Sequence, residues 1–430
     1  MDGEKIKVGA ALLGVGVVGG GTYKIITEQR EKIKKIYGVD LTVRHILERD
    51  KSKTDALGVD PSIVSTDIEN VLNDDGIQVV AEFFGGTEPA KTFLIKCLMK
   101  GKSVVTSNKE LVCKHFAELE DAARIGGGGL YFEASCVGGV PIVRTLTDAM
   151  QANDIREIKG IINGTTNYIL SRMANDGTDY ADALKTAQKL GYAEADPTAD
   201  TEGYDAAYKL SILSSLAYNK RVPIDKIFRE GINNVAAEDI NFGKEFGMTL
   251  KLLGISKSIG GKIEARVHPA FIGDNHPLAS VKGSFNAVYL KGNNVGDIML
   301  YGRGAGDLPT GSAIVSDMVF ASVNTRHRRY PFINETVSDG DFISNFSSKY
   351  YIRMKVTDKA GTLSKISGIF GRFGVSITTV LQKPPTDESG IVSIIFITHI
   401  TNENAISEAV KAIKDLESVA EISNVIRVEE

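Results

Sequence analysis

The sequence lacks an apolar stretch long enough to cross a membrane. Its longest uncharged run, Val8 to Tyr23, is rich in glycine and shorter than the roughly 20 residues that a spanning helix requires. The residues before this run alternate charges with single apolar side chains and do not resemble a signal peptide. We therefore expect a cytoplasmic protein that has no membrane partner.

Cysteine is scarce, and neither sign of charge prevails. The three cysteines, Cys97, Cys113 and Cys136, lack the spacing of metal ligands, so we expect reduced thiols and neither a disulfide framework nor a zinc site. The 50 basic and 54 acidic residues give a formal net charge of -4. Because the basic residues are dispersed, we expect no polyanion such as a nucleic acid as a partner.

The chain is long for a single hydrophobic core. At 430 residues, of which 43% are hydrophobic, it predicts about three compact units. In the N-terminal part, β-rich runs alternate with helix-patterned stretches such as residues 22–36 and 89–99, which is typical of an α/β fold with a Rossmann-type, doubly wound parallel sheet. The predicted strands are Ile6–Leu13, Leu41–Leu47, Ile77–Phe84, Ser103–Ser107 and Leu130–Phe132.

The pattern changes along the chain and predicts further domains. We predict a dinucleotide-binding domain over residues 1–140, completed by part of residues 305–325, and an α+β substrate-binding and catalytic domain over residues 141–325. Residues 326–349 have no sustained period, so we interpret them as a linker. Residues 350–430 have the order βαββαβ, typical of a ferredoxin-like module, and we expect this module to be an independent unit.

Three glycines directly follow the first predicted strand. Gly14, Gly16 and Gly19 form the pattern GxGxxG ahead of a helical stretch, where glycines allow a tight turn and close approach of the backbone to a pyrophosphate. The motif alone is weak, but the strand before it and the β/α units after it favour dinucleotide binding over an ordinary turn. The expected cofactor contacts are Gly14, Val15, Gly16, Val17, Val18 and Gly19.

The choice between NAD and NADP stays open at the end of the second predicted strand. Arg49 could hold a 2′-phosphate through charge-assisted hydrogen bonds, whereas Glu48 or Asp50 could accept a hydrogen bond from a 2′-hydroxyl. A solvated turn of mixed charge explains these residues equally well. We include Arg49 among the candidate cofactor contacts.

Two more loops follow the third and fourth predicted strands. They lie at the carboxyl ends of these strands, where open α/β sheets bind ligands. The second of these loops ends at Lys109, where a helix is expected to begin. A cation at the start of a helix opposes the helix dipole, so this position favours a functional lysine over an ordinary surface lysine. The candidate cofactor contacts in the two loops are Gly85, Gly86, Thr87, Thr106, Ser107 and Lys109.

An acid and a base face inward on a later predicted helix. Asp205 and Lys209 are four residues apart, and the same helical stripe continues through apolar residues to Leu216. A pair on an apolar face needs specific partners, so we interpret it as catalytic rather than as a surface salt bridge. The acidic loop before this helix, with Glu194 and Asp200, either enters the same space or is solvated.

Around this pair the chain resembles the homoserine dehydrogenases, which interconvert homoserine and aspartate 4-semialdehyde. The positions that match their signature are Ala187, Gly191, Asp196, Pro197, Asp200, Gly203, Asp205 and Lys209. The similarity covers nearly the whole region before the linker. Thr201 replaces a usual aliphatic residue, and Cys136 with Val137 replaces a valine–glycine pair, but neither change removes a charged group.

The resemblance implies a role for each candidate residue. It implies that Lys109 and Lys209 handle the proton and that Asp205 orients Lys209 and the substrate. Glu194 would bind the substrate ammonium, and Asp200 would also contact the substrate. NAD or NADP would supply the hydride. The implied reaction belongs to threonine, methionine and isoleucine biosynthesis.

The resemblance also implies a bound monovalent cation, such as Na⁺. Its ligands would be Glu133 and the main-chain carbonyl groups of Cys136, Gly138 and Val140. A glycine-rich loop further along would return to the cofactor at Gly306; the alternative is a flexible hairpin.

The C-terminal module resembles the ACT fold, which senses amino acids at paired domains. Asp358 and Gly361 lie between its first strand and first helix and are the candidate regulatory residues. The alternative is a module that only assembles subunits. The resemblance implies threonine as the effector and a homodimer or homotetramer. Because no kinase-sized segment precedes the glycine loop, we expect the monofunctional form of the enzyme.

Two other functions fit parts of the sequence. An aspartate-semialdehyde dehydrogenase shares the cofactor and a substrate, but it needs a thiol nucleophile, for which Cys136 is the candidate. A catalytically silent amino-acid sensor would use both ends of the chain for binding alone. The two lysines, Lys109 and Lys209, and the long signature favour a homoserine dehydrogenase over both.

Overall fold

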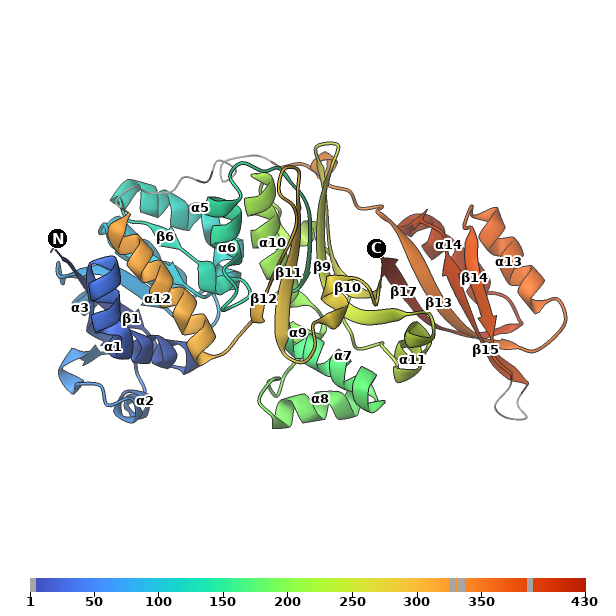
Figure 1. Ribbon diagram of the computed structural model, residues 1–430, viewed down its shortest axis with the longest axis horizontal. Coiled ribbons are helices and arrows are strands. Elements are labelled where there is room, and N and C mark those ends of the chain that lie inside the picture. Colours follow the sequence, from blue (N-terminus) through green and yellow to red (C-terminus); the bar gives the residue numbers. More distant parts are fainter. Residues whose placement is uncertain (1–4, 325–329, 331–336, 385–389) are drawn as a thin grey trace. The chain divides into compact units, whose positions relative to one another are not determined.

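The computed structural model describes residues 5–324, 330, 337–384 and 390–430. The chain divides into two compact units, whose elements are labelled in Figure 1. The first unit contains Met1–Gly164, Asp205–Ile227 and Phe285–Ser338, and the second contains Thr165–Tyr204, Phe228–Ser284 and Asp339–Glu430. The domain boundaries expected after residues 140, 325 and 349 stay predictions.

A six-stranded parallel sheet forms the centre of the first unit. The strand order is β3-β2-β1-β4-β5-β6, and every neighbouring pair is parallel. The chain moves outward from β1 to β3 and then crosses back to β4, which confirms the predicted doubly wound sheet. The strands are β1 (Ile6–Leu13), β2 (Val39–Leu47), β3 (Val64–Ser65), β4 (Ile77–Glu82), β5 (Ser103–Thr106) and β6 (Leu130–Tyr131).

Two helices that are distant in sequence share the core of this sheet. Helix α1 spans Val17–Tyr37 and helix α12 spans Asp307–Val323, and they lie side by side in Figure 1. They approach closely because Gly21 has no side chain: a Cβ there would lie 2.4 Å from the carbonyl oxygen of Asp307. The buried residues that join helices and strands include Val8, Leu12, Ile26, Ile314 and Met318.

The remaining elements of the first unit surround the parallel sheet and add three antiparallel strands. Strand β11 pairs with β7 on one side and with β12 on the other. These strands are β7 (Ile155–Ile161), β11 (Phe285–Gly292) and β12 (Gly296–Arg303). The helices are α2 (Lys51–Ala56), α3 (Glu69–Leu72), α4 (Ala90–Met99), α5 (Lys109–Gly126), α6 (Ile142–Arg144) and α10 (Tyr204–Tyr218).

A mixed sheet forms the centre of the second unit. Strands β9 and β10 make a long antiparallel hairpin, and β10 also pairs in parallel with β17. The strands are β8 (Phe228–Arg229), β9 (Met248–Ile259), β10 (Lys262–Gly273), β13 (Ser347–Thr357), β14 (Ile377–Gln382), β15 (Ile391–Thr398), β16 (Thr401–Asn402) and β17 (Val419–Glu429). The helices are α7 (Gly164–Asp176), α8 (Tyr180–Lys189), α9 (Thr198–Thr201), α11 (Ala237–Glu245), α13 (Thr362–Arg372) and α14 (Glu403–Lys414).

The C-terminal module has the predicted βαββαβ order, and one of its strands also pairs with β10. Strands β13, β14, β15 and β17 with helices α13 and α14 enclose a core of their own. However, β17 also covers an edge of β10, and Arg266 of β10 is buried against Glu429 of β17. Without β17 the strand β10 would present an open edge. Whether the module folds independently stays a prediction. Residues 326–329 and 331–336 of the predicted linker lie outside the described residues.

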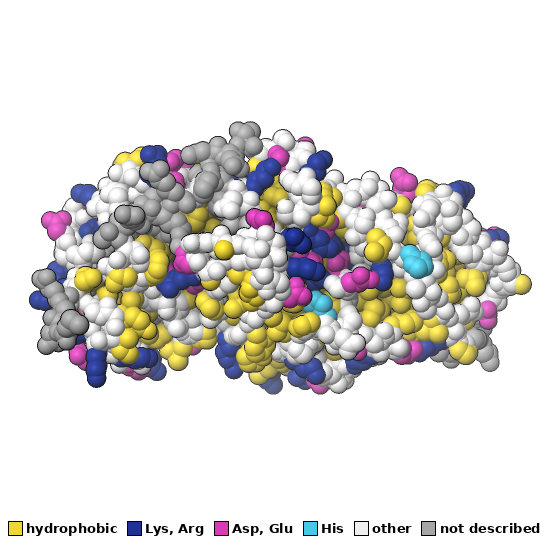
Figure 2. Space-filling view, turned by 45° about the horizontal axis from the view of Figure 1, so that its top comes forward, with side chains coloured by type: hydrophobic (Ala, Val, Ile, Leu, Met, Phe, Trp, Pro, Cys, Tyr) yellow, Lys and Arg dark blue, Asp and Glu magenta, His cyan; other side chains and the backbone are white. Residues whose placement is uncertain are grey.

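On the face shown in Figure 2, neither basic nor acidic side chains prevail. Basic and acidic side chains are interspersed there, which agrees with the near balance of charges in the sequence. In the part of the chain that the structure describes, each helix is too short or too polar to span a bilayer.

Candidate active site

The glycine loop after β1 has the geometry that a pyrophosphate requires. Gly14 has a φ of 94°, which favours glycine, and a Cβ on Gly19 would lie 2.3 Å from the Gly14 carbonyl oxygen. Gly16 caps helix α1 without a side-chain hydrogen bond, and the first turn contains no acid. Beside Gly16, the space where a Cβ would stand is open. The start of the helix can therefore receive an anion.

At the end of β2, the three residues that could recognise the ribose differ in the hydrogen bonds that their side chains make. The carboxylate of Glu48 accepts hydrogen bonds from the backbone N–H groups of Val15 at 3.0 Å, Arg49 at 2.9 Å and Asp50 at 3.0 Å. Asp50 caps α2 by accepting from Ser52. Among the described residues, the exposed side chain of Arg49 has no hydrogen bond or ion pair. Arg49 is thus available to a ligand, as is the second carboxylate oxygen of the exposed Asp50, since both hydrogen bonds from Ser52 end on Oδ1.

The carboxyl ends of β1, β4 and β5 bring the three predicted cofactor loops to one edge of the sheet. These strands are neighbours and parallel, so the loops that follow them, residues 14–19, 85–87 and 106–109, lie along that edge. The side chain of Asn108 joins two of these loops, since it donates to the carbonyl oxygen of Gly86 at 2.6 Å. It also accepts from the N–H of Leu111 and thereby caps α5.

Lys109, Asp205 and Lys209 form one cluster in the first unit. The Nζ atoms of Lys109 and Lys209 lie 3.0 Å and 2.7 Å from different carboxylate oxygens of Asp205. Asn163 donates to the same carboxylate at 2.8 Å, and Lys209 also donates to the carbonyl oxygen of Ile162 at 2.9 Å. The sequence alone assigned no role to Asn163. Its position two residues after the end of β7 could have indicated that it lies in a ligand-binding loop.

The carboxylate of Asp205 stays charged between the two ammonium groups. Burial alone raises the pKa of Asp205, but the ammonium groups of Lys209 and Lys109 hold this pKa well below its usual range. Asp205 therefore stays ionised and fixes both lysines. Lys209 donates two of its three N–H bonds, to Asp205 and Ile162, and no other described residue accepts the third.

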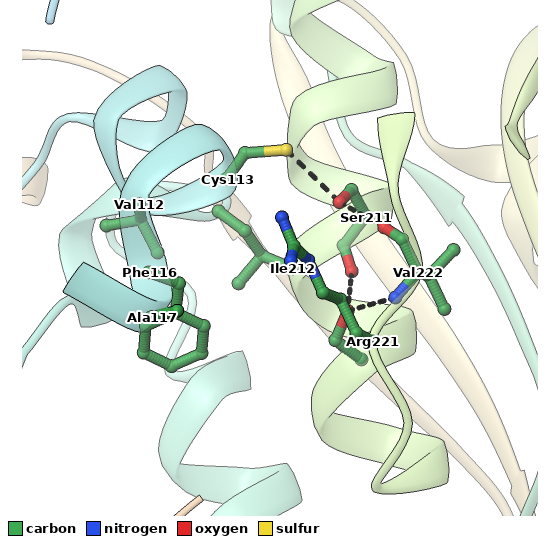
Figure 3. A pocket seen from close by; sticks show the side chains of 9 residues that line it. Val112, Cys113, Phe116, Ala117, Ser211, Ile212, Arg221 and Val222 are labelled. Atoms are coloured by element: carbon green, nitrogen blue, oxygen red, sulfur yellow. Dashed lines mark hydrogen bonds between the residues drawn. The ribbon is translucent and has the colours of Figure 1, made fainter. Parts of the chain in front are cut away.

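Contacts further along α5 and α10 hold the helices that carry these lysines. Figure 3 shows the thiol of Cys113 on α5 facing Ser211 on α10, with 3.2 Å between Sγ and Oγ. The hydroxyl of Ser211 donates in turn to the carbonyl oxygen of Val222 at 2.6 Å. Because Cys113 lies one turn after Lys109, this contact fixes the helix close to the cluster.

Cys136 lies beside the cluster but is buried. Its Sγ is 3.9 Å from the carbonyl oxygen of Lys209, and its side chain is not accessible to solvent. Burial raises the pKa of the Cys136 thiol to about 12. A thiol with such a pKa is protonated at neutral pH and is a poor nucleophile.

The predicted cation loop fits the proposed ligands only in part. The carboxylate of Glu133 accepts hydrogen bonds from the N–H groups of Val143 at 2.9 Å and Arg144 at 2.8 Å, so it caps α6. Val140 already accepts from Ile142, whereas no described N–H group donates to the carbonyl oxygens of Cys136 and Gly138. The described residues contain no cluster of three acidic, cysteine or histidine side chains for a metal. The cation site stays a prediction.

The other predicted contacts lie in different parts of the chain. Gly306 has a φ of 121°, a conformation that side chains disfavour, and it caps α12. Glu194 is exposed and Asp200 half-buried in the segment between α8 and the end of α9. Both acids belong to the second unit, and their contact with the substrate stays a prediction.

A doubly wound sheet with a pyrophosphate-type helix start and a lysine–aspartate–lysine cluster defines an NAD(P)-dependent oxidoreductase. Two sequence profiles agree: "Homoserine dehydrogenase, NAD binding domain" matches residues 14–133, and "Homoserine dehydrogenase" matches residues 141–319. A third, "ACT domain", matches residues 350–418. The chain belongs to the homoserine dehydrogenase family.

Individual relatives are similar over the whole chain. The homoserine dehydrogenase of Bacillus subtilis is 38% identical over 99% of both chains. A crystal structure of a homoserine dehydrogenase from Thiobacillus denitrificans has a TM-score of 0.91 and 37% identity, covering 99% of this chain and 98% of that one. A hyperthermophilic archaeal homoserine dehydrogenase in complex with NADPH has a TM-score of 0.63 and 27% identity, covering 74% of this chain and 98% of that one.

Proposed function

We propose that this protein catalyses the NAD(P)-dependent interconversion of L-homoserine and aspartate 4-semialdehyde. The observation that carries the proposal is the Asp205 carboxylate held between the ammonium groups of Lys109 and Lys209. An alcohol and its aldehyde differ by a hydride and a proton. The protein therefore needs a group that moves a proton at the oxygen on C4, and the lysines supply it.

In the direction of reduction, the cluster binds the aldehyde oxygen and protonates it. The nicotinamide cofactor, when bound, supplies the hydride to C4. The third N–H of Lys209 would donate to the substrate oxygen, and Lys109 would contribute a second positive charge as negative charge develops there. Asp205 holds both ammonium groups in place. Glu194 binds the substrate ammonium, with Asp200 as a further substrate contact.

We infer that NADP is the preferred cofactor. The acids that would accept from a 2′-hydroxyl, Glu48 and Asp50, already accept from backbone N–H groups. Arg49 remains available for a 2′-phosphate, whose charge a guanidinium binds well. The similarity to an archaeal homoserine dehydrogenase in complex with NADPH supports this choice. The further cofactor contacts are those proposed in the loops after β1, β4 and β5, together with Gly306.

We also propose a homodimer or homotetramer in which threonine binds the C-terminal module and inhibits turnover. A hollow of about 260 Å³ lies beside Asp358 and Gly361, where helix α13 begins. Gln382, which also lines this hollow, donates to Asp358 at 3.1 Å. The open start of the helix suits a carboxylate, and Asp358 suits an ammonium group, so the hollow has the charges that an amino acid needs.

A chain of contacts supports this regulation, because within the second unit it joins the module to the segment that contains Glu194 and Asp200 and ends at Tyr204. Arg427 of β17 pairs with Glu403 of α14 and with Glu230. The neighbouring Arg229 donates to the carbonyl oxygen of Glu202 and lies 3.5 Å from the centre of the Tyr204 ring. Tyr204 immediately precedes Asp205 in the sequence.

We also propose a monovalent cation whose ligands are Glu133 and the main-chain carbonyl groups of Cys136, Gly138 and Val140. The main-chain carbonyl groups of Cys136 and Gly138 fit such an ion, which would stabilise the strained turn at Val137, where φ is 58°. Glu133 would then act through its main chain, because its carboxylate is engaged with α6.

The test is steady-state turnover of homoserine with NADP and with NAD. A catalytically silent sensor gives no turnover with either nucleotide, and a second assay, with the semialdehyde and phosphate, identifies the other alternative. An aspartate-semialdehyde dehydrogenase gives phosphate-dependent turnover of the semialdehyde instead, which the buried thiol of Cys136 disfavours. Absence of homoserine turnover with both nucleotides would overturn the proposed function.

A further inference from the structure

Glu82 is a buried acid for which the mechanism above has no use. It is the last residue of β4, and its side chain has no exposed surface. Within the described residues it has no basic partner. Burial raises its pKa to about 7. A buried carboxyl group without a counter-charge costs free energy, so its hydrogen bonds need an explanation.

The two oxygens of Glu82 bind two different loops of the site. One accepts from the N–H of Phe84 at 2.5 Å, directly before the glycines at 85 and 86. The other accepts from the hydroxyl of Thr106 at 2.5 Å. Thr106 ends β5 and is paired with Glu82 across the sheet. One carboxyl group thus joins the turns that follow β4 and β5.

The contact continues from Thr106 to the helix that carries Lys109. The Thr106 hydroxyl oxygen accepts from the N–H of Asn108 at 3.0 Å. Asn108 caps α5, whose first residue is Lys109, and it donates to Gly86 in the other turn. Glu82, Thr106 and Asn108 therefore form a closed set of hydrogen bonds beneath Lys109.

We propose that Glu82 is a positioning residue for Lys109: it joins the turns after β4 and β5 and so fixes the start of α5. The proposal rests on the proposed function, because it concerns the lysine that handles the proton. Glu82 acts through Thr106 and Asn108 and touches no reacting atom. An apolar residue would fill the same space but could not accept the N–H of Phe84 and the hydroxyl of Thr106 together.

The test compares Glu82→Ala with Glu82→Gln in the full chain. Alanine removes both contacts, so Lys109 loses its position and kcat for the semialdehyde falls about 10- to 100-fold. Glutamine can still accept from Phe84 and can donate to Thr106, so it keeps kcat within about threefold of the wild type. Each variant is also assayed with a nucleotide deuterated at the transferred position.

The isotope effect separates positioning from a loss of folded enzyme. If Lys109 is misplaced, the chemical step slows and the deuterium effect on kcat of Glu82→Ala rises above that of the wild type. A smaller folded fraction lowers the rate and leaves the isotope effect unchanged, which would overturn the proposal. An equal loss of kcat in Glu82→Gln would also overturn the proposal, because kcat would then depend on the charge of Glu82 and not on its hydrogen bonds.

Two further variants keep the test decisive. Thr106→Val removes the contacts of Thr106 with Glu82 and Asn108, so it tests the same set of hydrogen bonds if Glu82→Ala does not fold. We expect it to lower kcat and raise the isotope effect as Glu82→Ala does. An isotope effect equal to that of the wild type in Thr106→Val would count against positioning. Asp74→Asn is the matched control, because Asp74 binds Gly76 and Arg44 at the opposite end of β4 and should leave kcat unchanged. Failure of the proposed function is recognised separately, since the wild type would then show no turnover at all.

Discussion

The ion pair between Arg266 and Glu429 gives a quantitative prediction for the C-terminal strand. Nη1 of Arg266 lies 2.6 Å from Oε1 of Glu429, and its Nε lies 2.8 Å from Glu264. The Arg266 side chain has no exposed surface. His268, which also contacts Arg266, stays neutral because burial, and then the charge of Arg266, lowers its pKa. Glu429→Gln therefore leaves a buried guanidinium with one acid where it had two.

The magnitude follows from the pKa of Glu429. Burial alone raises this pKa, but the charge of Arg266 lowers it from 4.5 to about 2. That difference corresponds to about 3 kcal/mol of stabilisation, which agrees with the roughly 3–5 kcal/mol measured when one partner of a buried pair is removed. Because the folded-state pKa is the lower one, the stabilisation is complete above about pH 4.5 and is lost as the pH falls toward 2.

Urea denaturation followed by circular dichroism measures the effect. At pH 7, Glu429→Gln should lower the free energy of unfolding by about 3 kcal/mol, and at pH 3 the difference should fall to less than half of that. The control is Glu421→Gln on the same strand, whose exposed pair with Lys355 contributes at most about 1 kcal/mol. Equal losses in both variants, or a loss at pH 3 as large as at pH 7, would refute this reasoning.

Three further predictions concern activity. Lys209→Ala should lower kcat at least about 100-fold with an unchanged circular dichroism spectrum, since general acid–base groups contribute that much, and near-normal kcat would contradict the assigned role. Arg49→Ala should raise the KM for NADP and leave the KM for NAD unchanged; equal changes would place Arg49 outside the 2′-phosphate site. Threonine should inhibit the full-length enzyme, and Asp358→Ala should weaken that inhibition, as titrations of turnover would show; an enzyme that ignores threonine would leave the module an assembly domain. Truncation after Lys349 is a poorer test than this substitution, because it also removes β17 from β10.

The sequence predicted the parallel sheet well because each of its strands is a short apolar run between turns. Helix α1 was expected from residue 22 but begins at Val17, since the glycines at its start have a low helix propensity that packing against α12 overcomes. Strand β9 was not predicted. Lys251 and Gly254 interrupt its apolar pattern, yet Lys251 is buried and donates to the carbonyl oxygen of Val281 at 2.5 Å.

The members of the candidate catalytic cluster could be predicted where their positions in the sequence were unusual. Lys109 stands out at a helix start, and Asp205 with Lys209 lies on an inward stripe. Glu82 could not be recognised, because its proposed role depends on which strand pairs with β4. The sequence of one strand does not show which strand lies beside it. The contact of the Glu133 carboxylate with the start of α6 could not be predicted either, because α6 is a helix too short for any periodicity to reveal.

The strength of the contact between β10 and β17 limits how an effector can act. Releasing the C-terminal module would separate Arg266 from Glu429, at a cost of about 3 kcal/mol for this pair alone, and would also open the edge of β10. The coupling free energy between two ligand sites is typically about 1–3 kcal/mol. We therefore expect that an amino acid bound beside Asp358 would act with β17 in place and would not detach the module. Contacts such as the pair of Arg427 with Glu230 would then pass its effect to the segment that contains Glu194 and Asp200 without breaking the shared sheet.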